Sequence, residues 1–440
     1  ELVQAAVQRQ VRVIVANPVA GGLDRHAVDV LRLTPGSVND LLSGVAARLM
    51  VLESTSAHRI ENLPGYDAWR QSVEAFSPES IRRATRIVGE TVDRLALGLA
   101  AARRPVLVMG TGSGVPGDEA AVARAASALT ALLGSDAGLL VLGGRSNVQG
   151  LVDVGLHPRL LPGHRLVGQA VELEDLTGRA TLSEEGWTVY QWVAAGPEAA
   201  SGLLLVGVDP VDLLPRGEDP RRALEGANFS VVVDAFLTST AQRANVVLPA
   251  AILSEREGTT VGADGVRRPF RQALDPPDGV YSDTVILTEI ARRMGAALPG
   301  GDDLEREIDR VVGWNWGRSQ PRRLSPVAQP RAAAAASGFL LDAAPQLFHS
   351  GSVTMRSALL QELSPTVAVR LNPADARALG VARGEVVAVS SERGEVLLRA
   401  RLDRAVCSGT VVVPWVGSRD GASTLYEETG EVLSVKVRKA

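Results

Sequence analysis

The chain has only one cysteine in 440 residues. A single thiol excludes internal disulfides, and it excludes any iron–sulfur cluster that four thiolates of this chain would hold. Cys407 lies beside the apolar Val406, just before a valine-rich run. We therefore expect its side chain to be a small buried core residue, not a nucleophile or a metal ligand.

A long apolar run is also missing. The best candidate, residues 126–144, is interrupted by Gly-Ser-Asp at 134–136, so no segment reaches the ~18 uncharged residues that a membrane helix needs. Charge is balanced as well, because 46 basic and 50 acidic residues leave a net charge of -4. These features predict a chain with no direct membrane span and no nucleic-acid partner.

The histidines lack the spacing of metal ligands. No two of the five lie three or four residues apart, which is the spacing that places two imidazoles on one helix face. No nucleophile-elbow sequence marks a serine, either. We therefore expect no metal site and no complete active site on this chain. The histidines are His26, His58, His157, His164 and His349.

Short apolar runs alternate with stretches of helical periodicity through residues 1–150, which predicts a first α/β domain with a parallel sheet and helices on both faces. Ser77 followed by Pro78 predicts a helix N-terminus. The expected order is β-α-α-β-α-β. The strands are expected at 11–15, 105–109 (buried) and 138–142, and the helices include 38–50 and 120–133.

A second α/β domain is expected at residues 151–316. Its predicted strands, 202–206 and 230–234, end in the polar turns at Asp209 and Asp234. Ligands of open α/β sheets bind beyond the carboxyl ends of the strands, so we expect a dinucleotide site at these turns. The predicted helices of this domain cover 187–200 and 282–294.

The last part of the chain changes pattern. Residues 317–338 are rich in proline and alanine and predict a linker. In residues 339–440 the apolar period becomes two, which predicts a small β-barrel. Its expected strands are 386–390, 396–401 and 410–413.

The segment 245–267 is the most informative motif. Its apolar residues 246–248 predict a short buried strand that Pro249 ends, and Gly258, Gly262 and Gly265 let the following backbone bend close to a ligand or partner. Glu255 and Glu257 could transfer protons, but such a pair is more often solvated or paired with arginine. The Gly-rich turn at 110–114 lacks the dinucleotide spacing and predicts only a tight turn.

Two blocks of sequence resemble the molybdopterin oxidoreductase superfamily. The first contains Asp-Ala-Phe-Leu-Thr-Ser-Thr-Ala at 234–241, Asn-Val-Val-Leu-Pro at 245–249, Glu-Gly-Thr at 257–259 and Asp-Gly-Val-Arg at 264–267. The second contains Val-Thr-Met-Arg at 353–356, Leu-Asn-Pro-Ala-Asp at 371–375 and Gly-Glu-Val-Val at 384–387. Within the superfamily, residues 147–155 and the closing Asp-Gly-Val-Arg at 264–267 are most similar to the large peripheral-arm subunit of NADH-quinone oxidoreductase, respiratory complex I. Formate dehydrogenase is the near alternative.

The resemblance implies two Rossmann-like α/β units of the formate dehydrogenase and DMSO reductase type, followed by a double-psi β-barrel. It also implies that this chain is the C-terminal part of an oxidoreductase subunit whose iron–sulfur clusters lie N-terminal to Glu1. That expectation agrees with a chain that begins without Met and without a visible export signal. The implied partners are other peripheral-arm subunits of complex I, at the cytoplasmic face of the cell membrane.

The family's pterin dinucleotide contacts map onto nine positions, which we expect to be vestigial. The resemblance implies that two turns that hold the nucleotide end in the family have lost their carboxylates here, because this chain has Asn-Pro-Val at 17–19 and Pro-Gly-Ser-Val at 35–38, and Val38 cannot accept a hydrogen bond. A buried guanine donor without a partner costs on the order of 1–3 kcal/mol. We therefore expect a scaffold without its own cofactor, and a bound molybdopterin guanine dinucleotide is the alternative. The nine positions are Asp234, Thr238, Glu257, Gly258, Thr259, Arg267, Thr354, Arg356 and Asn372.

Overall fold

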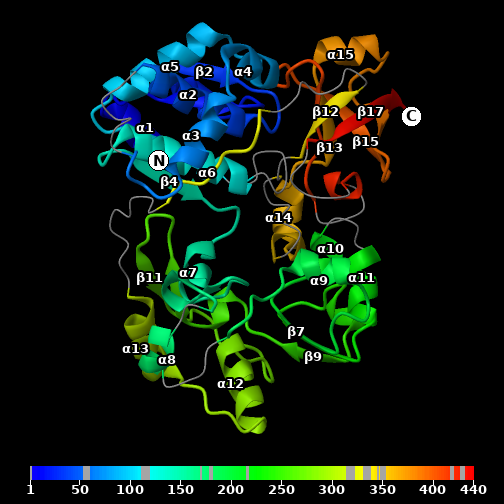
Figure 1. Ribbon diagram of the computed structural model, residues 1–440. Coiled ribbons are helices and arrows are strands. Elements are labelled where there is room, and N and C mark those ends of the chain that lie inside the picture. Colours follow the sequence, from blue (N-terminus) through cyan, green and yellow to red (C-terminus); the bar gives the residue numbers. More distant parts are fainter. Residues whose placement is uncertain are drawn as a thin grey trace. The chain divides into compact units, whose positions relative to one another are not determined.

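The computed structural model divides into two compact units, Glu1–Gly144 with Ser319–Ala440, and Arg145–Arg318 (Figure 1). The residues described are 2–52, 60–110, 119–168, 171–177, 182–214, 218–313, 323–330, 338–343, 346, 353–416, 421–426 and 432–440.

The α/β part of the first unit contains two pairs of parallel strands. β1 pairs with β2, and β3 pairs with β4. The helices pack into a core around α2, in which Trp69, Leu41, Val45 and Leu129 are almost completely buried. The elements are α1 (Leu2–Gln8), β1 (Ile14–Asn17), the 3-10 turn η1 (Asp24–His26), β2 (Asp29–Arg32), α2 (Val38–Val51), α3 (Tyr66–Glu74), α4 (Pro78–Thr85), α5 (Gly89–Ala101), β3 (Val106–Gly110), α6 (Glu119–Leu133) and β4 (Gly138–Leu142).

The helices predicted at 38–50 and 120–133 are confirmed as α2 and α6. Ser77 caps α4 as predicted, because its Oγ accepts a hydrogen bond of 3.2 Å from the Ser80 amide. The predicted element order is wrong, because β2, α3 and α5 were not anticipated. The strand at 105–109 is not buried as predicted, since the side chains of Val106 and Val108 are more than half exposed.

The described part of the predicted linker, residues 323–330, packs on this first core. Leu324 and Val327 are buried in it. The Leu324 amide donates to the Pro64 carbonyl at 2.9 Å, and the Val327 amide donates to Ser72 Oγ at 3.0 Å. Residues 317–322 and 331–337 of the segment lie outside the described residues.

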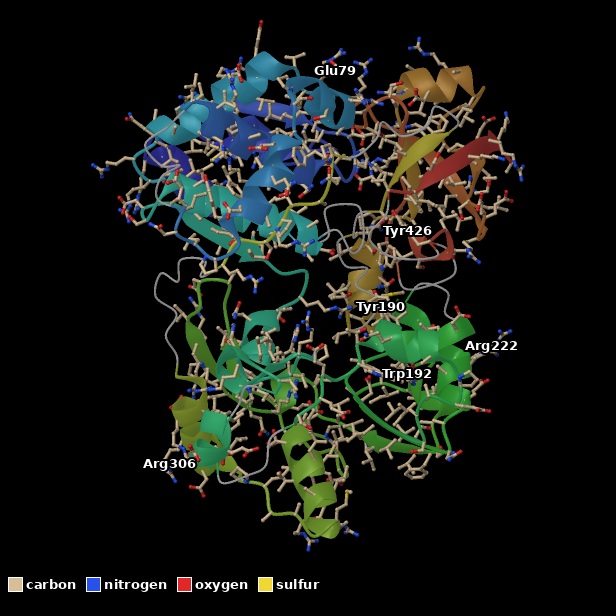
Figure 2. The ribbon with its side chains drawn as sticks, in the orientation of Figure 1. Glu79, Tyr190, Trp192, Arg222, Arg306 and Tyr426 are labelled. Carbon is tan, nitrogen blue, oxygen red and sulfur yellow. The ribbon has the colours of Figure 1, made fainter. Side chains whose placement is uncertain are left out.

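The second unit is built on a three-stranded parallel sheet in the order β7-β8-β9. Trp192 of α9 packs with Ala223 and Leu224 of α11 near this sheet (Figure 2). The elements are α7 (Val148–Asp153), β5 (Leu160–Leu161), η3 (Pro162–His164), β6 (Arg165–Leu166), α8 (Val171–Thr177), α9 (Val189–Ala195), β7 (Gly202–Val206), α10 (Pro210–Leu213), α11 (Glu218–Glu225), β8 (Phe229–Asp234), η4 (Ala241–Arg243), β9 (Val246–Pro249), η5 (Leu253–Glu255), β10 (Gly258–Val261), β11 (Arg267–Phe270), α12 (Asp283–Arg293) and α13 (Gly301–Val312).

The strands predicted at 202–206 and 230–234 are confirmed, and so is the helix at 282–294, which Ser282 caps. The helix predicted at 187–200 is too long. It ends at Ala195 because Gly196 has a φ of 87° and Pro197 follows. The strand at 246–249 is half-exposed instead of buried, because alternate side chains face solvent.

Residues 339–440 contain a closed six-stranded barrel in the order β12-β16-β13-β15-β14-β17, which confirms the predicted barrel. On β15, Val396, Leu398 and Ala400 are buried and alternate with exposed residues. No described helix is long and apolar enough to cross a membrane. The elements are β12 (Phe339–Asp342), η6 (Val353–Arg356), α14 (Ala358–Leu363), β13 (Ala368–Leu371), α15 (Pro373–Ala378), β14 (Val386–Ser390), β15 (Glu395–Leu402), β16 (Thr410–Val412), η7 (Ala422–Thr424) and β17 (Ser434–Lys439).

Candidate functional site

The turn after β8 carries two of the predicted contacts. Asp234 ends the strand, and its Oδ1 accepts a hydrogen bond of 2.9 Å from the Phe236 amide. Thr238 is buried, and its Oγ1 accepts from the Ala241 amide at 3.1 Å. Both residues lie at the carboxyl edge of the sheet, as the sequence predicted for ligand-binding turns. Both side chains also stabilise the turn itself, which is an ordinary role for Asp and Thr there.

A buried polar cluster lies at the end of β7, and the sequence indicated only its turn. Asp209 Oδ1 accepts hydrogen bonds from the amide of Thr240 at 3.2 Å and from its hydroxyl at 2.5 Å. Ser239 Oγ donates to Asp212 Oδ2 at 2.7 Å. Burial raises the pKa of Asp209, although the Thr240 hydroxyl opposes that rise. These hydrogen bonds connect the turn after β7 to the turn after β8. In the sequence, the Ser-Thr pair at 239–240 was the feature that could have indicated this cluster.

The signature segment forms an antiparallel hairpin of β10 and β11. Gly258 pairs with Phe270, and Thr259 pairs with Pro269. A Cβ at Gly258 would lie 2.9 Å from the Phe270 ring, so packing inside the hairpin explains this glycine without a ligand. Gly265 has a φ of 74° and forms the hairpin turn.

Arg267, the last residue of the signature, forms ion pairs with Glu305 and Asp309 of α13. Its guanidinium is therefore engaged by the same unit of the chain. Glu257 is exposed. Glu255 Oε2 accepts a hydrogen bond of 3.1 Å from the Ile252 amide and stabilises the turn η5. Glu255 therefore has a main-chain partner, which differs from the solvated or arginine-paired role that the sequence favoured for this acidic pair.

The three barrel candidates belong to the other compact unit. Asn372 Oδ1 caps α15 by accepting from the Ala374 amide at 2.8 Å, and its Nδ2 donates to the Val406 carbonyl at 2.8 Å. Thr354 and Arg356 lie in η6, and Arg356 is exposed. Six of the nine predicted contacts thus lie in Arg145–Arg318 and three in the barrel part of the first unit.

Cys407 is not a core residue, which corrects the prediction. It is half-buried, and its Sγ lies 3.8 Å from the Pro18 carbonyl oxygen, to which the thiol donates. The preceding Val406 is the residue that enters the core. The sequence could not distinguish the two because both lie in the loop between β15 and β16, where no periodic pattern indicates which side chain is buried.

The three histidines among the described residues, His26, His157 and His164, all form hydrogen bonds within the protein. His164 Nε2 lies 2.9 Å from the fully buried Asp153, whose carboxylate also accepts from Gln149 at 2.7 Å. Among the described residues, no group of three or more His, Cys, Asp or Glu could hold a metal ion. His58, His349 and residues 111–114 of the Gly-rich turn lie outside the described residues.

One of the two turns assigned to the nucleotide end, at residues 35–38, is packed by the protein itself. A guanine edge presents N–H donors and needs carboxylate or carbonyl acceptors that it can reach. Pro35, Gly36 and Ser37 are buried by the protein itself, and Ser37 Oγ donates to the Thr34 carbonyl at 2.7 Å. Asp40, the carboxylate nearest to Val38 in sequence, is fully buried in the first turn of α2.

Comparison with known families agrees with this architecture. Residues 1–293 match the family described as molybdopterin oxidoreductase, and residues 341–427 match the molydopterin dinucleotide binding domain. The chain belongs to the molybdopterin oxidoreductase family. Acetylene hydratase from Pelobacter acetylenicus has a similar fold, with a TM-score of 0.70 and 16% sequence identity over 99% of this chain and 75% of that one.

Relatives of this family member act in several different complexes. The NADPH-Fe(3+) oxidoreductase subunit alpha of Geobacter sulfurreducens is 27% identical over 100% of this chain and 54% of its own length. The F420-dependent formate dehydrogenase 2 subunit alpha of Methanococcus maripaludis is 27% identical over 92% and 68%. A NADH-quinone oxidoreductase subunit of Rhizobium meliloti is 28% identical over 93% and 49%. The chain thus spans about half the length of the Geobacter and Rhizobium relatives.

Proposed function

We propose that the chain is the C-terminal structural part of the large subunit of a NADH-quinone oxidoreductase. In this role it packs against other peripheral-arm subunits and supports electron transfer by iron–sulfur clusters outside this fragment. The complex would lie at the cytoplasmic face of the cell membrane. The similarity to the Rhizobium NADH-quinone oxidoreductase subunit over 93% of the chain supports this assignment.

The observation that carries the proposal is the use of the family's polar positions for internal contacts. Arg267 pairs with two carboxylates of α13, and both amide atoms of Asn372 bond to main-chain atoms of the barrel part. A polar group that already has partners gains little from a ligand, because binding would exchange one hydrogen bond for another. These positions therefore favour a scaffold without its own pterin dinucleotide.

A second candidate is the C-terminal part of a formate-dehydrogenase-like enzyme that binds a molybdopterin guanine dinucleotide. Two findings favour it. Residues 341–427 match a dinucleotide-binding domain, and a formate dehydrogenase subunit is among the relatives. Under this alternative, the nine positions mapped from the family's pterin dinucleotide contacts would bind the cofactor.

Purification of the native complex from the source organism separates the two candidates. We expect a tagged chain to co-purify with further subunits that oxidise NADH and reduce a quinone, and the preparation to lack stoichiometric molybdenum or tungsten. Inductively coupled plasma mass spectrometry measures the metals, and pterin fluorescence after acid oxidation measures the organic part. A preparation with one metal per chain that oxidises formate would establish the second candidate instead.

A further inference from the structure

The carboxyl edge of β1 and β2 is filled by the chain's own residues. In a parallel α/β sheet this edge is where a ligand would lie. Asp24 of η1 forms an ion pair with Arg32 at the end of β2, and the Gly21 amide donates to the same carboxylate oxygen at 3.1 Å. Arg32 Nη1 also donates to the Asn17 carbonyl at 3.5 Å. The guanidinium thus links the ends of both strands.

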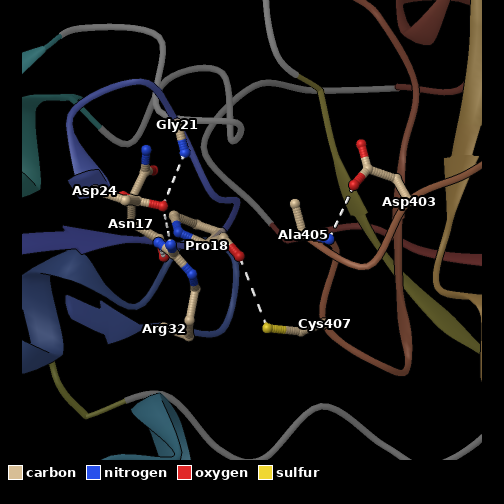
Figure 3. A network of polar contacts seen from close by, with 8 residues as sticks. All are labelled: Asn17, Pro18, Gly21, Asp24, Arg32, Asp403, Ala405 and Cys407. Atoms are coloured by element: carbon tan, nitrogen blue, oxygen red, sulfur yellow. Dashed lines mark hydrogen bonds and ion pairs between the residues drawn. The ribbon is translucent and has the colours of Figure 1, made fainter.

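The same edge touches the barrel through residues 403–409, which we name the clasp loop (Figure 3). The Ala20 amide donates to the Ala405 carbonyl at 3.3 Å. The Cys407 thiol donates to the Pro18 carbonyl at 3.8 Å. A third contact comes from the end of α4, where Arg86 Nη1 donates to the Ser408 carbonyl at 3.1 Å. Three points of contact fix the clasp loop against the α/β part of this unit.

Barrel residues hold the clasp loop in its conformation. Asn372 Nδ2 donates to the Val406 carbonyl at 2.8 Å. Asp375 accepts hydrogen bonds from Ser408 Oγ at 2.5 Å and from the Gly409 amide at 2.8 Å. Asp403, which accepts from the Ala405 amide at 2.9 Å, is paired with Arg370 at 2.8 Å. Because the loop is already ordered by its own barrel, docking on the β1 turn costs little conformational entropy.

We propose that the clasp loop is a permanent internal interface that closes the β1–β2 edge, so that this edge binds no guanine nucleotide. Two main-chain carbonyls, of Asn17 and Pro18, accept bonds from Arg32 and Cys407. A base entering the edge would have to break these bonds and separate the clasp loop from the α/β part. The inference concerns this unit alone and does not depend on which complex the chain joins.

Cys407 gives a direct probe of the interface, because it is the only cysteine of the chain. We expect N-ethylmaleimide to modify Cys407 in the native chain at least ~10-fold more slowly than in the urea-unfolded chain. The reason is that the clasp loop must open locally before the reagent can reach the thiol. Arg86→Ala and Asp375→Asn, which remove contacts of the clasp loop, should each accelerate labelling. Arg82→Ala is the matched control, since this exposed arginine of the same helix pairs with Glu79 and not with the loop. Intact-mass spectrometry measures the rates.

Equal labelling of the native and unfolded chains would overturn the proposal, and so would equal rates for Arg86→Ala and Arg82→Ala. A calorimetric titration of the chain with GMP tests the ligand part. We expect no saturable heat at millimolar GMP. Saturable binding of GMP that the substitution Asp24→Asn abolishes would show that the carboxyl edge of β1 and β2 is open, and would overturn the proposal. A chain that fails to co-purify with NADH-quinone oxidoreductase subunits but excludes GMP would refute only the proposed function.

Discussion

Replacement of Asp342 by asparagine should stabilise the barrel above neutral pH. Asp342 ends β12 and is 3% exposed. Burial raises the pKa of its carboxyl from 3.8 to about 7, although the Arg370 guanidinium opposes that rise. Close by, burial and the same carboxyl raise the pKa of Tyr426, whose hydroxyl has no hydrogen-bond partner within the described part of the chain (Figure 2). The free-energy cost of ionising Asp342 in the folded barrel can therefore be measured from the pH dependence of the free energy of unfolding.

The sign follows from proton linkage. Below pH 3.8, Asp342 is protonated in both the folded and the unfolded chain, so it affects stability little. Between that value and about 7 the unfolded chain loses the proton while the barrel keeps it, which lowers the free energy of unfolding. Above pH 7 the loss is complete. A rise of the pKa from 3.8 to about 7 corresponds to about 4 kcal/mol, which is an upper bound for the gain in Asp342→Asn.

Hydrogen exchange of the strand peptides in residues 386–402 measures the opening free energy of the barrel. We expect Asp342→Asn and the native chain to agree near pH 4 and to differ by a few kcal/mol at pH 8. Glu395→Gln, an exposed carboxylate-to-amide change on β15 of the same barrel, should leave both values almost unchanged. Equal stability of Asp342→Asn and the native chain at pH 8 would refute the argument.

Two further substitutions test the second unit. Arg267→Ala removes the ion pairs with Glu305 and Asp309, which are partly exposed, so we expect a loss of only about 1 kcal/mol, measured by hydrogen exchange of α13. A loss of stability above ~3 kcal/mol would mean that the carboxylates of Glu305 and Asp309 are left desolvated and unpaired when Arg267 is removed. Thr240→Val leaves the buried Asp209 without its hydroxyl donor, and we expect a loss of about 1–3 kcal/mol in urea unfolding. No loss would show that the Thr240 amide alone satisfies the carboxylate.

Local sequence signals predicted the elements that carry their own stabilising features. The cap Ser77 and the alternation in β15 depend on neighbours within a few residues, so the sequence shows them. β2 was missed because its four residues, Asp29–Arg32, begin and end with charges and show little periodicity. Its strand conformation comes from pairing with β1, which a local pattern does not reveal.

The candidate site was predicted less completely, because its chemistry depends on distant partners. The sequence identified Arg267, but Glu305 and Asp309 come from a helix that follows much later in the chain. It identified Asn372 as a possible ligand contact, and the structure shows that this side chain caps α15 and donates to the Val406 carbonyl. A side chain at the end of an element can serve either role, and only the three-dimensional partners decide between them.

This ambiguity explains how a family member could lose a ligand and keep its fold. Asn372 and Thr238 stabilise a helix terminus and a turn, so selection for folding alone would retain them after any ligand was lost. Residues that contact only the ligand have no such protection, and the resemblance implies that carboxylates of this kind are missing from the turns at 17–19 and 35–38. In this chain the Asn17 carbonyl accepts a hydrogen bond from Arg32, and the adjacent Pro18 carbonyl accepts one from the Cys407 thiol. If the chain has no cofactor of its own, as we propose, a cofactor-binding member of the family should differ most from it at the β1 turn and the clasp loop.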